Sequence, residues 1–206
     1  MRRWPRRERR GGSRRRAVAR RAGLLGAAVA LLIAVAACGA QRARRTSAAL
    51  GARPASAAAA SPDATFTLLA GGRESLARLR GRPVLLWFIA SGCASCAVSI
   101  PAVGRNLSEF SRAHVRILAL GIYGSFGQGE EGLRSLARFA RAAAGASFKD
   151  RAWSWGVASA TLTERFDPSG VPDRYFLLDR SGQVVFQGST PVWTLRSLLD
   201  HLKEVA

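Results

Sequence analysis

The chain has 206 residues, of which 32 are lysine or arginine and 13 are aspartate or glutamate, for a formal net charge of +19. Such a charge would suit a nucleic-acid-binding protein, but its distribution argues against that class. Residues 1–62 hold 15 basic residues and one acidic residue, so residues 63–206 carry 17 basic against 12 acidic residues, a net of +5. The basic excess therefore belongs mostly to the N-terminal segment, and we expect no nucleic-acid partner.

Residues 1–37 have the pattern of an export signal. An arginine-rich stretch precedes an apolar run of 16 residues that ends at Cys38, and this run is short for a membrane span of about 20 residues. Val35-Ala36-Ala37-Cys38 resembles the bacterial lipobox, in which the cysteine is lipidated and becomes the first mature residue. We therefore expect an exported protein anchored to the extracytoplasmic face of a membrane. An uncleaved signal anchor, ordinary signal-peptidase cleavage and twin-arginine export through Arg20-Arg21 remain alternatives.

Composition changes twice along the rest of the chain. Residues 38–62 consist mainly of alanine, arginine, serine and proline with almost no large apolar residue, which is typical of a flexible tether. Residues 63–206 are mixed in composition and long enough to bury a core of their own. The sequence therefore predicts one folded domain over residues 63–206.

Strands and helices alternate in the predicted domain. Apolar runs predict strands, and apolar residues at helical spacing predict helices. The expected strands cover residues 65–69, 83–89, 115–122, 175–178 and 184–187, with a short edge strand at 153–157; the expected helices cover 94–110, 130–144, 159–166 and 194–205, with a helical turn at 75–79. This order implies an α/β sandwich around a mixed sheet.

Cys93 and Cys96 are the most informative residues. They follow the buried-strand pattern of residues 83–89 and the turn residues Ser91-Gly92, so they lie where a strand ends and a helix begins. The free N–H groups and the dipole of a helix N-terminus favour the thiolate of the first cysteine. The second thiol, one helical turn further on, is close enough to form a disulfide with it. This arrangement indicates thiol–disulfide exchange.

A static disulfide and half of a zinc site are the alternative interpretations of this pair. A disulfide that closes so small a loop would restrict the unfolded chain little. Zinc would need two more ligands, and His114 and His201 are isolated histidines, so we expect no metal. With Cys38 assigned to the anchor, no cysteine remains for a structural disulfide.

The strand-Ser-Gly-Cys-x-x-Cys-helix pattern, followed by Gly170-Val171-Pro172 before a strand, resembles the thioredoxin fold. The resemblance covers residues 63–206, and residues 66–68 and 81–88 together with 176–182 are closer still to the membrane-tethered TlpA-like branch. It implies a three-layer sandwich with a central mixed β-sheet. It also implies a cis Val171–Pro172 bond beside the cysteines, which leaves a backbone edge free to bind a substrate polypeptide.

The resemblance further implies a protein thiol–disulfide oxidoreductase that needs no bound cofactor beyond the Cys93–Cys96 disulfide. Cys93 would attack a partner disulfide and Cys96 would resolve the mixed disulfide. The expected partners are thiols and disulfides of exported proteins and a membrane electron donor or acceptor. The TlpA-like branch favours a reductase over an oxidase. A non-enzymatic thioredoxin-fold lipoprotein or scaffold and a peroxiredoxin-like peroxidase are the alternatives, although Ala90 stands where a peroxidase would need threonine or serine.

Several positions depart from the family pattern. Trp87 occupies the place of the buried carboxylate of thioredoxins, and Ser99 that of a glutamate common in TlpA-like proteins, so the usual proton acceptor for Cys96 is missing. Asp173 could substitute for it, but a solvated turn aspartate is the favoured interpretation. The hydroxyls of Ser91 and Ser95 could hydrogen-bond the thiolate.

Overall fold

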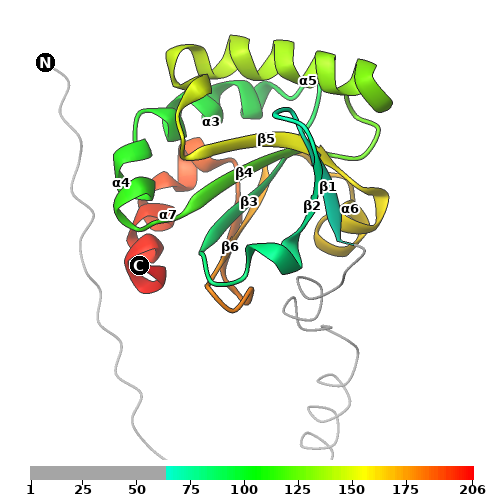
Figure 1. Cartoon of the computed structure of the whole chain (residues 1–206). Helices are drawn as coiled ribbons and strands as arrows, with labels where there is room; N and C mark the ends of the chain where they lie inside the picture. The colour runs from blue at the N-terminus through cyan, green and yellow to red at the C-terminus, as the bar shows by residue number, and fades with distance from the viewer. Residues whose placement is uncertain (1–63) are drawn as a thin grey trace, which may run out of the picture. The chain divides into compact units, whose positions relative to one another are not determined.

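The computed structural model describes residues 64–206 (Figure 1). Its elements in chain order are β1 (Thr65–Leu68), β2 (Arg73–Ser75), the 3₁₀ helix η1 (Leu76–Leu79), β3 (Val84–Ile89), α3 (Ala94–Gly104), α4 (Leu107–Arg112), β4 (Arg116–Gly121), α5 (Gly129–Ala144), the 3₁₀ helix η2 (Gly145–Lys149), β5 (Trp153–Ala158), α6 (Ala160–Phe166), β6 (Arg174–Leu178), β7 (Val184–Ser189) and α7 (Pro191–Val205). Strands and helices alternate through most of this order, as the sequence predicted.

The described strands form one mixed sheet in the order β2-β1-β5-β4-β3-β6-β7. The pairs β3–β4 and β4–β5 are parallel, whereas β1–β2, β1–β5, β3–β6 and β6–β7 are antiparallel. Every residue of β3 is buried, because this central strand is covered on both faces. The carboxyl end of β3, where the cysteine motif begins, therefore lies in the middle of the sheet.

Helices cover both faces of the sheet. Successive residues of a strand face opposite sides, and β3 accordingly contributes Leu85 and Trp87 to one apolar core and Leu86 and Phe88 to another. The first core includes buried residues of α3, α5 and α7, and the second includes those of α6. Figure 1 shows α3 and α5 together along one side of the sheet, with α6 beside β1. These three layers confirm the predicted α/β sandwich.

The helix predicted over residues 94–110 is in fact two helices. α3 ends at Gly104, and the side-chain amide of Asn106 donates a 2.9 Å hydrogen bond to the carbonyl of Ala102 in its last turn. Leu107 and Phe110 of α4 are nevertheless buried. The apolar spacing thus continues across the break, which is why periodicity did not reveal it.

The strand predicted at the edge of the sheet lies inside it. β5 is paired with β4 on one side and with β1 on the other, and the short polar strand β2 forms the edge instead. Gly156 permits this close pairing, because a Cβ atom there would lie 2.5 Å from the carbonyl oxygen of Thr67. The sequence Arg73-Glu74-Ser75 carries no apolar strand signal, so β2 was not predicted.

The predicted signal segment 1–37, the tether 38–62 and the lipidation residue Cys38 lie outside the described residues. Within residues 64–206, no helix is long and apolar enough to cross a membrane.

Candidate active site

The end of β3 places the two cysteines at a helix N-terminus. Gly92 has a φ of 71°, a left-handed conformation that glycine adopts without steric cost, and it turns the chain from β3 into α3. Cys93 is the N-cap of α3, and the backbone N–H of Cys96 donates to its Sγ at 3.1 Å. The sulfur therefore occupies the place of a capping oxygen, next to the positive end of the helix dipole.

Cys93 and Cys96 form a disulfide with a Cα–Cα distance of 5.3 Å. Cys93 is 8% exposed and Cys96 is completely buried, so a partner can reach the pair only through Cys93. The Ser95 hydroxyl lies 3.4 Å from the Cys93 sulfur in the disulfide, near enough to contact a thiolate at the same place. Ser91 does not have the predicted contact with a thiolate, because its hydroxyl donates to the backbone carbonyl of Ser125.

Asp173 lies beside the motif as a buried carboxylate. It is 1% exposed, so the interpretation of a solvated turn aspartate was wrong. The indole N–H of Trp87 donates to Oδ1 at 2.9 Å, and the hydroxyl of Ser99 donates to Oδ2 at 3.1 Å. Because Ser99 follows Cys96 by three residues on α3, the two side chains project from neighbouring positions of one helix face. The carboxylate therefore lies against the buried side of the cysteine motif.

The electrostatic environment of Asp173 favours its protonated form. Burial raises the pKa of this carboxyl group, and hydrogen bonds from Ser95, Trp87 and Ser99 lower it by less. Asp173 forms no ion pair with any residue of the part that the structure describes. A raised pKa makes the ionised carboxylate of Asp173 a stronger base than an ordinary aspartate.

The loop before Asp173 differs from the family expectation. Residues 64–206 contain no cis peptide bond, so Val171–Pro172 is trans and the prediction of a cis-proline is wrong. Trans is the lower-energy form of such a bond, and the chain direction changes instead at Asp173, whose φ is 70°. Asp173 is fixed there by its N–H, which donates to the carbonyl of Phe88, and by its carbonyl, which accepts from the N–H of Thr190, both at 2.8 Å. Val171, 51% exposed, is available at the surface of this loop.

The sequence did not reveal the burial of Asp173, because its partners are remote in the chain. Trp87 precedes it by 86 residues and Ser99 by 74. One local feature did indicate a turn. Asp173 directly follows Pro172, and aspartate tolerates the left-handed backbone conformation better than most residues. This feature gives no information about solvent exposure.

Comparisons with known proteins show relationship at the level of the fold. No protein-family model matches the chain, and no match was found among curated proteins. A solved structure of a candidate protein disulfide isomerase from Bacteroides thetaiotaomicron is 22% identical and has a TM-score of 0.53, over 70% of this chain and 86% of its own. A thioredoxin-like protein from Porphyromonas gingivalis is 16% identical with a TM-score of 0.53, over 71% of this chain and 92% of its own. The fold is thioredoxin-like.

A third solved structure, with a similar TM-score, is that of a peroxiredoxin. Peroxiredoxin Q from Xanthomonas campestris is 20% identical, with a TM-score of 0.52 over 71% of this chain and 93% of its own. At such identities the likeness concerns the fold alone. The chemistry of this chain must therefore be argued from its own residues, which are Cys93, Cys96 and Asp173.

The described residues offer no separate metal centre. Among residues 64–206, no three histidine, cysteine, aspartate or glutamate side chains gather closely enough to hold a metal ion. His114 and His201, the two histidines considered as zinc ligands, belong to different parts of the fold, before β4 and within α7. The chemistry available at the end of β3 is that of the cysteine pair and its buried carboxyl group.

Proposed function

We propose that this protein is a thiol–disulfide oxidoreductase that acts on protein disulfides through Cys93 and Cys96. One observation carries the proposal: the two cysteines form a disulfide at the N-terminus of α3, with Cys93 8% exposed and Cys96 completely buried. This asymmetry suits an attacking and a resolving thiol. A bridge with only a structural role would gain nothing from one sulfur being accessible.

In the reducing direction, the thiolate of Cys93 attacks one sulfur of a partner disulfide. A bond forms between Cys93 Sγ and that sulfur, and the partner's own S–S bond breaks to release a thiolate. Cys96 then loses its proton and attacks Cys93 Sγ, which breaks the mixed disulfide. Two electrons pass from the Cys93–Cys96 dithiol to the partner disulfide. The two thiols of this protein release two protons in all, and the two thiolates of the partner take up two.

We assign Asp173 as the proton acceptor for Cys96. A buried thiol reacts slowly unless a nearby base removes its proton. The carboxylate of Asp173 is buried against the same helix and is oriented by Trp87 and Ser99. Trp87 and Ser99 stand at the two positions where thioredoxins and TlpA-like proteins, which this chain resembles, carry a carboxylate. Here both side chains instead donate hydrogen bonds to the carboxylate of Asp173.

We further propose that the domain works outside the cytoplasm as a membrane-tethered reductase of the TlpA-like kind. The export signal in residues 1–37, the lipobox-like Cys38 and the tether 38–62 support anchoring. The substrates would be disulfides of exported proteins, and a membrane protein would supply electrons to the oxidised pair. The same chemistry run in reverse would make the protein an oxidase.

A redox titration of the full chain in detergent tests both the activity and its direction. The fraction of reduced Cys93 and Cys96 would be counted by thiol alkylation and mass spectrometry across a series of thiol–disulfide buffers. A reversible two-electron midpoint well below about −200 mV is expected for a reductase. A midpoint near about −120 mV would identify a disulfide donor instead. A pair that does not titrate reversibly would refute the redox proposal and favour a non-enzymatic scaffold.

A further inference from the structure

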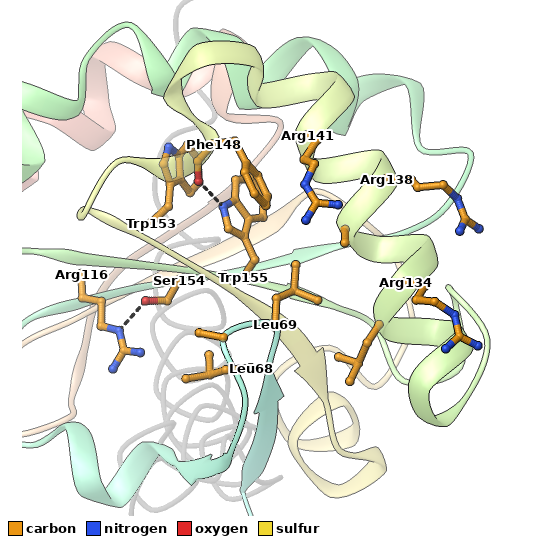
Figure 2. A pocket seen from close by; sticks show the side chains of 13 residues that line it. Leu68, Leu69, Arg116, Arg134, Arg138, Arg141, Phe148, Trp153, Ser154 and Trp155 are labelled. Carbon is orange, nitrogen blue, oxygen red and sulfur yellow. Dashed lines mark hydrogen bonds between the residues drawn. The ribbon is translucent and has the colours of Figure 1, made fainter.

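A cavity of about 700 Å³ lies between α5 and the sheet, away from the cysteine motif (Figure 2). Its floor and walls come from the end of β1, from β5, from η2 and from one side of α5. The apolar wall is formed mainly by Leu68, Leu69, Leu133, Ala137, Phe148 and Trp155. Its volume lies within the range of about 300–1,000 Å³ that small-molecule sites commonly have.

The wall presents carbon surfaces and few free polar groups. The indole N–H of Trp155 donates to the backbone carbonyl of Phe148 at 3.2 Å, so it is already satisfied. The hydroxyl of Ser154 accepts a 2.7 Å hydrogen bond from Arg116. The ring of Trp155 stacks on Phe148 at 5.8 Å and on Trp153 at 4.5 Å. A ligand in this cavity would therefore contact an aromatic and aliphatic surface.

Four arginines surround the apolar wall. Arg116 pairs with Glu74 and Arg134 with Glu130, each at 3.2 Å. Arg138 and Arg141 form no ion pair with any carboxylate in the described part of the chain. Figure 2 shows Arg141 beside the ring of Phe148, Arg138 and Arg134 further along α5, and Arg116 on the other side of β5.

We propose that this cavity binds a single-chain amphiphile with an anionic head group. The hydrocarbon chain would lie against the Leu and Trp wall, where burial of apolar surface supplies affinity. The head group would be bound by Arg138 and Arg141, which are the rim cations left without a carboxylate. Charge complementarity disfavours a cationic amphiphile, and the mainly apolar lining disfavours a polar sugar or base, since among the buried side chains that the structure describes in this lining only the indole N–H of Trp153 is left without a hydrogen-bond partner. The proposal does not depend on the thiol chemistry.

The test uses quenching of tryptophan fluorescence by a bromine atom on the ligand chain. The full chain would be placed in nanodiscs of zwitterionic lipid, because detergent would compete for the cavity. Trp4→Phe and Trp193→Phe in the background leave Trp87, Trp153 and Trp155, since the chain has five tryptophans. Bromododecanoate is expected to quench saturably, whereas bromododecanol with its neutral head should bind about tenfold more weakly.

Two double variants separate the arginine contribution from a general charge effect. Arg138→Gln with Arg141→Gln should weaken bromododecanoate binding about tenfold and leave bromododecanol binding unchanged. Arg165→Gln with Arg196→Gln, on α6 and α7, removes the same charge elsewhere and should change neither. Both pairs are exposed, so folding should be preserved. Equal binding of the acid and the alcohol, unchanged binding after the α5 substitutions, or an absence of saturable quenching would each overturn the proposal.

Discussion

Asp173 is held in place by hydrogen bonds from two side chains that are remote from it in the chain. The indole of Trp87 and the hydroxyl of Ser99 each donate to one of its carboxylate oxygens, and the Ser99 oxygen in turn accepts the backbone N–H of Val192 at the start of α7. These contacts join β3, α3 and α7 at a single carboxylate. A proton acceptor can therefore be supplied from the loop before β6 when the strand and the helix supply only donors.

Asp173→Asn should slow the resolving step of the reaction selectively. The substitution retains an acceptor for Trp87 but removes the base, and positioned bases typically contribute about 10²-fold or more. The reduced chain would be mixed with an aromatic disulfide that releases one coloured thiolate when Cys93 attacks and a second when Cys96 resolves. We expect an unchanged first phase and a second phase slowed about 100-fold. Asp200→Asn, an exposed carboxylate on α7, is the control, and equal slowing of both phases would contradict the assignment.

Asp173 should also make stability depend on pH. Burial raises its pKa above the ordinary value of 3.8. Between the unfolded and the folded pKa, the folded state binds more protons, so stability falls as pH rises through that interval. At a pH above the folded-state pKa of Asp173, the Asp173→Asn variant should therefore be more stable than the native chain. Below pH 3.8 it should be no more stable than the native chain. A gain of about 1 kcal/mol corresponds to about 2–4 °C in Tm for a domain of this size. An equal offset in thermal unfolding at both pH values would indicate a packing effect instead.

The pairing of β1 with β5 depends on a glycine. A Cβ atom at position 156 would lie 2.5 Å from the backbone oxygen of Thr67, which cannot move without opening the sheet. Gly156→Ala should therefore lower the free energy of unfolding by about 1–3 kcal/mol, measured by urea denaturation. Gly104→Ala is the matched control, because its Cβ would lie 2.7 Å from the Ser147 hydroxyl, a side-chain group that can turn away at the cost of one hydrogen bond to the carbonyl of Ala144. Equal losses in the two variants would contradict this explanation.

The elements that the sequence predicted best are those whose own residues determine them. The run Val84–Ile89 is apolar throughout and forms a central strand, and Leu136 and Ala140 share the buried face of α5. The cysteine motif could be placed for the same reason, since Gly92 and the following helix are local features. Strand order was not accessible in this way, because the burial of Trp153–Ala158 between two neighbours depends on pairing with distant segments. The burial of Asp173 was missed for that same reason.

An aromatic column connects the cavity under α5 with the redox site. Phe148 stacks on Trp155, Trp155 on Trp153, and Trp153 lies 6.1 Å from Trp87, whose indole N–H binds Asp173. Trp153 and Trp155 are each 6% exposed, so this column belongs to the buried core. Because packed interiors transmit displacement, a ligand that shifts Trp155 has a continuous path of contacts to the Asp173 carboxylate.

The proposed anchor determines which partners the domain can reach. The tether that we propose over residues 38–62 would, as a flexible chain of 25 residues, have an r.m.s. reach of about 25–30 Å, so a lipidated chain would meet disulfides close to the membrane. Cys38→Ala should abolish the addition of lipid to the chain, which intact-mass measurement on the membrane fraction of a bacterial host would show. Cys96→Ala, which removes a cysteine from the redox pair instead, should remain membrane-bound. Intact-mass measurement would show whether the native chain begins at Cys38 with added lipid. A native chain that retains residues 1–37 and carries no lipid would instead establish the uncleaved anchor.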